Sequence, residues 1–319
     1  MKTILACCLD NISFPPEDTE VWIINTQSRS LKSGEAVEKV RRALKLLKEF
    51  QPDYIYKKID STLRGNIGYE LEAAAEEMNL DSIPLCAAFP EMGRTTVKGV
   101  HYVNGKTITD TQYASDINAP VKDPDINSLL SSQMEDPKKV RVLDASTSKD
   151  MEANCSKEAG STFFSGASDW AGKLTDAWMA SPRKPESVVF APAPVLVISG
   201  SLNPVSIEQI NYFKKVKEKD SPDDLIATDP LELKSGALKK MIKKAKKKFL
   251  KSYTRALLVG GETSDEFLKE IDVNNMEVVS SPMSGISLVS YRDYFFILKP
   301  GGFGKKEALV NLCALLGGK

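Results

Sequence analysis

Two short segments in the first third of the chain hold residues that could bind a small anion. The first, Asp60-Ser61-Thr62-Leu63-Arg64-Gly65-Asn66, follows the strand-like run Tyr54–Ile59 and precedes an amphipathic helical pattern over Ile67–Met78. A helix N-terminus beside an arginine, at the carboxyl end of a strand, is a favourable anion site. The alternative stays open that Asp60 and Ser61 only cap a turn while Arg64 is a surface charge.

The second segment, Phe89-Pro90-Glu91-Met92-Gly93-Arg94-Thr95-Thr96, follows the apolar run Ile83–Phe89 and predicts another strand-to-helix junction. Arg94 could hold a carboxylate through two parallel hydrogen bonds. A plain loop that ends in an exposed arginine is the alternative.

Three segments near the C-terminus could hold phosphate groups. Ser199-Gly200-Ser201 follows the apolar run Val195–Ile198, and Asn203 with Pro204 predicts the start of a helix that runs to Lys215. The run Gly260-Gly261-Glu262-Thr263 ends another strand, and the spacing of Thr263 and Glu266 predicts a capping box. Lys299, Gly301 and Gly302 end the strand Tyr294–Leu298. Each could equally be a structural turn, and no Walker A motif is present.

These segments resemble, in order, the four-carbon acid sugar kinases. The resemblance rests on Lys58–Asn66, Phe89-Pro90 with Gly93–Thr96, Val103-Asn104-Gly105, Asp110-Thr111, Ser199–Ser201 with Gln209, Gly260–Thr263 and Lys299–Gly304. It implies ATP-dependent phosphorylation of a small sugar acid such as a threonate, erythronate or 2-oxo-tetronate, with Mg²⁺. The first domain would bind the acid and the second ATP.

The resemblance also implies roles for individual residues. Asp60 would hydrogen-bond or deprotonate the acceptor hydroxyl. The acid would contact Lys58, Ser61, Arg64, Gly65, Asn66 and Arg94. The nucleotide would contact Ser199, Gly200, Ser201, Gly260, Gly261, Glu262, Thr263, Lys299, Gly301 and Gly302. No metal ligand can be named.

One departure from the family pattern keeps other functions open. Family members open with an Ala-Asp-Asp-Leu-Thr-Gly-Ala block, which this sequence does not contain. Either the protein lacks the acidic pair or the chain begins downstream of it. A relative that binds sugar acid or nucleotide without turnover is therefore the first alternative. A nicotinamide-dependent oxidoreductase is a distant one, because no G-x-G-x-x-G opens a helix after a first strand.

Composition is that of an ordinary cytosolic enzyme. Lys and Arg number 43 and Asp and Glu 43, so no overall field favours nucleic acid. Five cysteines without a CxxC pair argue against a disulfide framework or metal site, and a single histidine, His101, excludes a cluster of histidine metal ligands. No apolar run is long enough to span a membrane. We expect a cytoplasmic protein, with a homo-oligomer left open.

The order of elements predicts an α/β protein of two domains, 1–185 and 186–319, each with a mostly parallel sheet flanked by helices. In the first domain we expect a strand over Val21–Thr26, a helix over 34–50 and a long irregular insertion over 104–137 that could overhang the acid site. The proline-rich stretch 181–194 reads as the linker. Seven lysines over Lys239–Lys248 predict a solvated helix face rather than a nucleic-acid or membrane contact.

Overall fold

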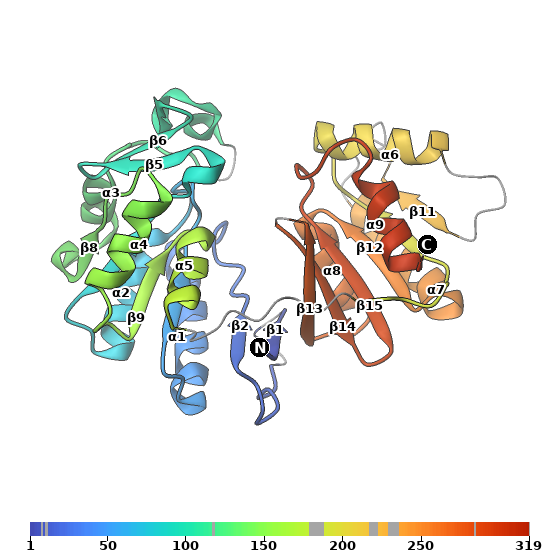
Figure 1. Ribbon diagram of the computed structural model, residues 1–319, viewed down its shortest axis with the longest axis horizontal. Coiled ribbons are helices and arrows are strands. Elements are labelled where there is room, and N and C mark those ends of the chain that lie inside the picture. Colours follow the sequence, from blue (N-terminus) through green and yellow to red (C-terminus); the bar gives the residue numbers. More distant parts are fainter. Residues whose placement is uncertain are drawn as a thin grey trace. The chain divides into compact units, whose positions relative to one another are not determined.

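The computed structural model describes residues 1–7, 9, 12–116, 119–178, 188–216, 223–228, 236–283 and 285–318. The chain forms two compact units, Thr26–Pro182 and a second unit that joins Met1–Asn25 to Arg183–Lys319 (Figure 1). The expected linker falls partly outside the described residues, which resume at residue 188. Each unit has its own sheet and its own core, so the expected α/β fold class is confirmed.

The unit Thr26–Pro182 is built on a four-stranded parallel sheet in the order β3-β9-β4-β8. Its strands and main helices are α1 (Ser33–Phe50), β3 (Ile55–Lys58), α2 (Ile67–Met78), β4 (Ile83–Cys86), β8 (Val140–Val142), α4 (Ser148–Lys157), β9 (Phe163–Gly166) and α5 (Ser168–Trp178). The predicted helix over Ile67–Met78 is confirmed at both ends.

Alternation along the strands of this sheet supplies two apolar layers. Leu85 and Phe163 pack in the layer formed by α1, α2 and α3 (Ile126–Gln133), whereas their neighbours Cys86 and Phe164 pack in the layer formed by α4 and α5. Successive side chains of a strand point to opposite faces, so a strand covered on both faces needs apolar side chains on each of them. The carboxyl ends of all four strands meet at one edge of the sheet.

The segment after β4 differs from the prediction, because Arg94 opens a strand and not a helix. A short 3₁₀ turn, η1 (Pro90–Met92), leads into the antiparallel strands β5 (Arg94–Val97), β6 (Val100–Val103) and β7 (Lys106–Thr107). The two hairpin turns are Lys98-Gly99 and Asn104-Gly105, and all four residues have positive φ. Two-residue turns of this kind match the twist of paired strands, and Asn-Gly is their strongest sequence signal.

The insertion expected over residues 104–137 is more regular than predicted. It contains β7, α3 and the 3₁₀ turns η2 (Ile108–Asp110) and η3 (Gln112–Ser115), and it ends where the 3₁₀ turn η4 (Pro137–Lys139) begins. Asp125 caps α3 by accepting the Ser128 N–H at 3.0 Å, which is the usual role of an aspartate before a helix.

The second unit is built on an eight-stranded sheet in the order β11-β10-β12-β15-β14-β13-β1-β2. Its elements are β1 (Thr3–Ala6), β2 (Val21–Ile24), β10 (Leu196–Ser199), α6 (Pro204–Val216), β11 (Asp224–Ala227), α7 (Ala237–Ser252), β12 (Arg255–Val259), α8 (Gly261–Glu270), β13 (Asn275–Met283), β14 (Ile286–Tyr291), β15 (Tyr294–Lys299) and α9 (Ala308–Gly317). The four strands β11, β10, β12 and β15 are parallel, and β14 and β13 are antiparallel to their neighbours.

The first 25 residues do not belong to the expected first domain. β1 pairs with β13 in antiparallel register and with β2 in parallel register, so both strands extend the sheet of the C-terminal unit. The strand predicted over Val21–Thr26 forms, but it does not join the sheet of β3. On the side away from β14, β13 would otherwise present an edge of unpaired backbone N–H and C=O groups. Such an open edge favours the addition of another strand, which explains the placement of β1.

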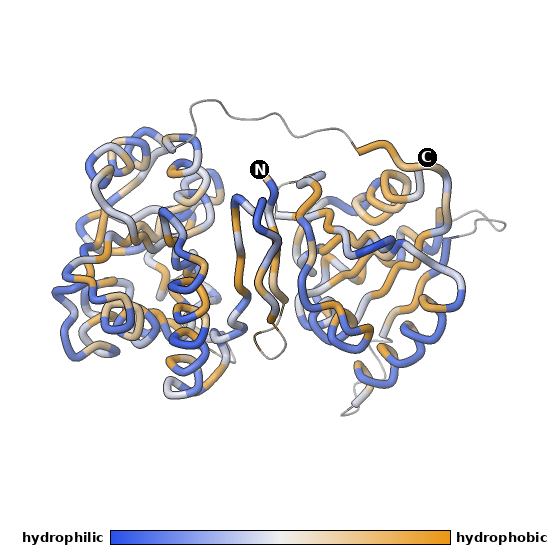
Figure 2. Tube along the Cα trace, turned by 90° about the horizontal axis from the view of Figure 1, so that it is seen from below, coloured by the Kyte–Doolittle hydropathy of each residue, from blue (hydrophilic) through white to orange (hydrophobic). Residues whose placement is uncertain are grey.

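Helix α7 carries the lysine run as predicted. Met241, Ile242, Ala245 and Phe249 are buried, and they pack with the apolar face of the sheet and with α8. The lysines occupy the remaining face, which gives this helix its alternation of blue and orange in Figure 2. Among the described residues, no helix is long and apolar enough to cross a membrane.

Candidate functional site

The junction between β3 and α2 is organised around the carboxylate of Asp60. Its Oδ1 accepts hydrogen bonds from the Thr62 N–H at 2.9 Å and the Thr62 hydroxyl at 2.6 Å. Its Oδ2 accepts from Arg64 Nε at 3.0 Å and lies 3.0 Å from Arg29 Nη1. Burial alone would raise the pKa of Asp60, but the hydrogen bonds from Thr62 and the charges of Arg64 and Arg29 lower it below its ordinary value.

The guanidinium of Arg64 lies between two carboxylates. Besides Asp60, whose Oδ2 is 2.8 Å from Arg64 Nη2, it contacts Asp116 through Nη1 at 2.9 Å. Its Cζ atom lies over the ring of Tyr113, 5.4 Å from the centroid, which is within the range of a cation–π contact. Tyr113 and Asp116 come from the expected insertion, which therefore reaches the first junction.

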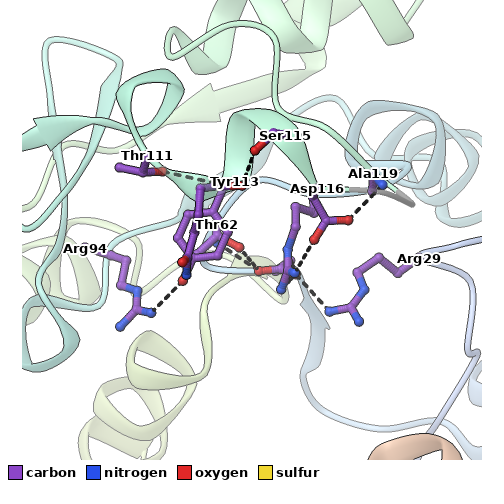
Figure 3. Close-up of polar contacts among 11 residues, drawn as sticks. Arg29, Thr62, Arg94, Thr111, Tyr113, Ser115, Asp116 and Ala119 are labelled. Atoms are coloured by element: carbon purple, nitrogen blue, oxygen red, sulfur yellow. Dashed lines mark hydrogen bonds and ion pairs between the residues drawn. The ribbon is translucent and has the colours of Figure 1, made fainter. Parts of the chain in front are cut away.

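Arg94 joins the same network from the second junction. Its Nη2 lies 3.4 Å from the Tyr113 hydroxyl, and its Nη1 donates to the Met92 carbonyl (Figure 3). Its Nε is buried and has no hydrogen-bond partner within the described residues, and no described carboxylate forms an ion pair with it. A buried donor without a partner is costly, so Arg94 has unused capacity for an acceptor that enters from solvent.

Gly65 and Asn66, two of the expected acid contacts, hold the segment that carries Arg29. Gly65 has φ +97°, and a Cβ placed on it would lie 2.8 Å from Arg29 Cγ and 3.0 Å from the Arg29 carbonyl oxygen. Asn66 Nδ2 donates to the carbonyls of Ser28 and Leu31, each at 3.0 Å. Both residues therefore fix the position of Arg29 beside Asp60.

His101 connects the two junctions. Its Nε2 lies 2.9 Å from the Ser61 carbonyl oxygen and its Nδ1 lies 3.0 Å from Thr96 Oγ1. A carbonyl only accepts, so Nε2 carries the proton and the neutral Nδ1 accepts from the hydroxyl. The side chain is fully buried, and burial lowers its pKa to about 4. The bond to Ser61 anchors the loop that also presents Asp60.

Lys58 adds a further positive charge at the end of β3. Part of its side chain is exposed to solvent, but desolvation by the surrounding protein lowers its pKa. The nearby carboxylate of Asp60 opposes this shift. The network thus contains the cations Lys58, Arg29, Arg64 and Arg94 and the carboxylates Asp60 and Asp116. Cations outnumber carboxylates, as expected of a site for an organic anion.

Sequence reasoning missed Arg29, Tyr113 and Asp116. Arg29 lies in a loop after β2, and only the fold brings it to Asp60 from 31 positions away. Asp116 reaches Arg64 across 52 positions. The one available signal was the density of polar residues in the insertion, which does not indicate which of them point inward.

In the second unit, three loops converge after the parallel strands β10, β12 and β15. The Gly200 N–H donates to Thr263 Oγ1 at 3.0 Å, and the Ser206 hydroxyl lies 2.9 Å from Ser201 Oγ and 2.7 Å from the Gly301 carbonyl oxygen. The structure thus brings together the segments that the sequence singled out. Ligands of open α/β sheets bind at this edge, beyond the carboxyl ends of the strands.

Glycines make the close packing of these loops possible. A Cβ on Gly200 would lie 2.7 Å from Thr263 Oγ1, and one on Gly301 would lie 2.3 Å from Ser201 Oγ. Gly260 has φ +102°, whereas a Cβ on Gly261 would meet no atom within 4 Å. Gly261, the first residue of α8, therefore faces open space.

The predicted capping box at Thr263 is wrong. Helix α8 begins at Gly261 after Gly260, and no side chain caps it. The Thr263 hydroxyl accepts from Gly200 of another loop instead. The backbone N–H groups at the start of α8 are consequently left without a side-chain cap, as in helix N-termini that bind anions.

Lys299 is almost completely buried at the end of β15. Its Nζ donates to the carbonyls of Pro300 at 3.0 Å and Gly301 at 3.4 Å, and burial lowers its pKa to about 8. The following loop is held by Gln209, whose Nε2 lies within 3.0 Å of the carbonyls of Phe303, Gly304 and Lys305. Lys299 thus supplies a positive charge directly below the glycine loop.

The chain matches the model of a known protein family. The model of a sugar-binding N-terminal domain matches residues 1–171. This chain belongs to that sugar-binding N-terminal domain family. Named relatives agree with the resemblance to four-carbon acid sugar kinases, which is confirmed at the level of the family.

Three relatives of this sugar-binding family illustrate the match. The D-threonate kinase of Salmonella typhimurium is 39% identical over 124 residues, which are 39% of this chain and 29% of the relative. The D-erythronate kinase of Heliobacterium modesticaldum is 29% identical over 222 residues, 60% of this chain and 49% of the relative. The 3-oxo-tetronate kinase of Pseudomonas savastanoi pv. phaseolicola is 32% identical over 120 residues, 36% of this chain and 28% of the relative. This chain thus matches less than half the length of each.

Solved structures share the fold. A Salmonella typhimurium LT2 protein superposes with a TM-score of 0.86 at 17% identity, over 98% of this chain and 92% of its own. Haemophilus influenzae protein HI1011 superposes with a TM-score of 0.79 at 20% identity, over 96% of this chain and 92% of its own. At such identities the likeness concerns the fold alone.

Proposed function

We propose that this member of the sugar-binding family is a kinase that transfers the γ-phosphoryl group of ATP to a hydroxyl of a small sugar acid. The observation that carries the proposal is the guanidinium of Arg94, whose buried Nε has no hydrogen-bond partner among the described residues, in the same network as the ion-paired Arg64. The names of the relatives support a four-carbon acid as the substrate, such as D-threonate, D-erythronate or 3-oxo-tetronate.

Arg94 is the residue that would bind the carboxylate of the acid. Arg64 has its nitrogens already directed at Asp60 and Asp116, whereas the partners of Arg94 within the described part of the chain are the neutral oxygens of Met92 and Tyr113. A planar guanidinium that lacks a carboxylate partner is well suited to receive one from a ligand. The positive charges of Arg29 and Arg64 would add an electrostatic potential that favours the anionic acid at the same edge of the sheet.

Asp60 would position Arg64 and Arg29 and not take a proton. Both of its oxygens already accept hydrogen bonds, and its pKa is lowered. A carboxylate stabilised in this way is a weak base at neutral pH. The catalytic role expected for Asp60 would then be one of orientation.

The three converging loops of the second unit support a nucleotide site. Gly261 offers an open backbone at an uncapped helix N-terminus, and Lys299 supplies positive charge at the carbonyls of Pro300 and Gly301 in the neighbouring loop. ATP would arrive with Mg²⁺, which neutralises charge on the transferring phosphoryl group. The described residues include no group of three or more His, Cys, Asp or Glu side chains that could hold a metal ion. Mg²⁺ is commonly held by substrate phosphates and water with few protein ligands, so it would be carried by the phosphates of ATP.

Calorimetry of acid binding tests this proposal. Arg94→Ala removes a charge-assisted contact and should weaken binding of the four-carbon acid by about 10- to 150-fold, which corresponds to about 1.5–3 kcal/mol. ATP affinity should stay unchanged, because Arg94 is in the other unit. Arg94→Lys should recover only part of the affinity, since an ammonium cannot form the two parallel bonds.

The control is Arg42→Ala, which removes an exposed arginine of α1 in the same unit and should leave acid affinity unchanged. Arg64→Ala should behave differently from Arg94→Ala. It should lower the melting temperature, because it removes the ion pairs that Arg64 forms with the partly buried carboxylates of Asp60 and Asp116. Normal acid affinity in a folded Arg94→Ala protein would contradict the assignment.

A further inference from the structure

We propose that Asp169 is the general base that removes the proton from the acceptor hydroxyl of the sugar acid. This inference rests on the proposed kinase function and adds a residue that the sequence motifs did not single out. It answers the question that the hydrogen bonding of Asp60 leaves open, namely which carboxylate is able to take the proton.

The topology places Asp169 at the same edge of the sheet as the acid site. Asp169 is the second residue of α5, three positions after the end of β9. Strand β9 pairs with β3 on one side and with β4 on the other. Asp60 follows β3, and Arg94 follows β4, so Asp169 begins its helix between the two segments that hold the proposed acid contacts.

The surroundings of Asp169 favour a basic carboxylate. Its Oδ2 is buried and has no hydrogen-bond partner within the described residues, and the side chain as a whole is half-buried. Burial raises its pKa, Glu91 on η1 raises it further, and Lys173 one turn along α5 opposes them. Asp60 and Asp169 thus lie at one sheet edge in environments that shift their pKa values in opposite directions, a pattern that separates an ion-pairing carboxylate from a proton acceptor.

Other titrating groups around Asp169 do not compete for this role. Tyr56 of β3 and Cys86 of β4 both interact with its charge. Burial raises the pKa of Tyr56 well above its ordinary value and that of Cys86 to about 12, so both stay neutral near pH 7. Lys173 is paired with Glu152 at 3.1 Å.

The proton and electron pairs balance in the proposed step. The hydroxyl O–H bond breaks and its proton passes to the Asp169 carboxylate. The hydroxyl oxygen forms a bond to the γ-phosphorus, and the bond from that phosphorus to the bridging oxygen breaks with its electron pair left on ADP. The reaction involves no redox change. In a loose transition state the base removes the proton late. Its contribution to the rate enhancement therefore belongs at the lower end of the range that is usual for general bases.

Asp169→Asn in the full chain tests the assignment, with Asp176→Asn as the matched control. Asp176 is an exposed aspartate on the same helix, two turns further on. With Mg-ATP and the acid that the wild type phosphorylates, Asp169→Asn should lower kcat by about 100-fold or more and leave both KM values within about threefold. Asp176→Asn should match the wild type.

The pH dependence gives a second measurement. The wild type should lose kcat/KM as pH falls through the raised pKa of Asp169, because protonation removes the base. Glu91→Gln should move this acid limb to lower pH without abolishing turnover, because it removes a neighbouring negative charge. The limb should be absent from the residual activity of Asp169→Asn.

The outcomes separate the two levels of the proposal. Wild-type kcat in a folded Asp169→Asn protein, or an acid limb that this substitution leaves in place, would overturn the role of Asp169 and leave the kinase function standing. If the wild type itself transfers no phosphoryl group, the proposed function fails and the base assignment fails with it. Asp169→Ser, a smaller neutral substitution, gives the same test if the asparagine variant does not fold.

Discussion

Replacement of His101 by glutamine should remove a large part of the acid sensitivity of the unit Thr26–Pro182. His101 is fully buried, bonded to Ser61 and Thr96, and its pKa is lowered to about 4. The unfolded chain binds a proton on this histidine near pH 6.5, whereas the folded protein does not until about pH 4. Folding stability contributed by the neutral histidine is therefore complete above pH 6.5 and is lost as the pH falls toward 4.

The size of the effect follows from the two pKa values. A difference of about 2.5 pKa units corresponds to about 3 kcal/mol, since one unit is worth about 1.4 kcal/mol. At pH 4.5 most of it is already lost, so the wild type should lose about 2–3 kcal/mol more between pH 7 and pH 4.5 than His101→Gln does. Carboxylates that titrate in both proteins cancel in this difference.

Urea unfolding followed by tryptophan fluorescence measures the difference. Trp170 is fully buried in the same unit as His101 and reports its unfolding. Thr96→Val serves as a control, because it removes the hydroxyl partner and leaves the histidine to titrate, so its pH slope should stay close to that of the wild type. Equal pH slopes for His101→Gln and the wild type would refute the reasoning.

Three further predictions concern glycines and a buried lysine. Gly260→Ala should lower the melting temperature, because φ +102° costs a non-glycine residue about 1–2 kcal/mol. Gly261→Ala should leave the melting temperature unchanged and raise the KM for ATP. Equal effects of the two substitutions on melting temperature in calorimetry and on KM in kinetics would contradict this prediction. Gly65→Ala should weaken acid binding in calorimetry by displacing Arg29, and unaltered affinity in the folded variant would argue against that coupling. ATP affinity should fall as pH rises through about 8, where Lys299 loses its charge. Lys299→Arg should abolish this fall in a series of ATP titrations at increasing pH. A fall in ATP affinity that persists in this variant would exclude Lys299 as its cause.

Local sequence signals predicted the elements around the acid site well. The amphipathic pattern over Ile67–Met78 and the apolar run at Ile83 fixed a helix and a strand because each element buries a periodic set of side chains. Which of the adjacent residues Gly260 and Gly261 adopts a positive φ was beyond such signals. Either of two adjacent glycines can adopt that conformation, and the packing of Ser201 against Gly260 decides between them.

Long-range pairing was the part that the sequence could not predict. β2 reads as the first strand of a βαβ unit with β3, yet it pairs with β1, which in turn pairs with the edge of β13, so both strands join the sheet of the C-terminal unit. Asp116 and Asp169 reach the candidate site through topology and not through a local motif. Asp169 resembles any aspartate in the first turn of a helix until its neighbours are known.

Phosphoryl transfer by the wild-type chain tests the central claim most directly. The chain is incubated with Mg-ATP and, in turn, D-threonate, D-erythronate and 3-oxo-tetronate, and ³¹P NMR follows ATP, ADP and phosphate esters. The account predicts that one of these acids yields a phosphate ester in equal amount to ADP, and that Arg94→Ala at the same acid concentration yields far less. Binding of acid and ATP by calorimetry without any ester would identify a relative that binds its ligands without turnover, and that result would contradict the account.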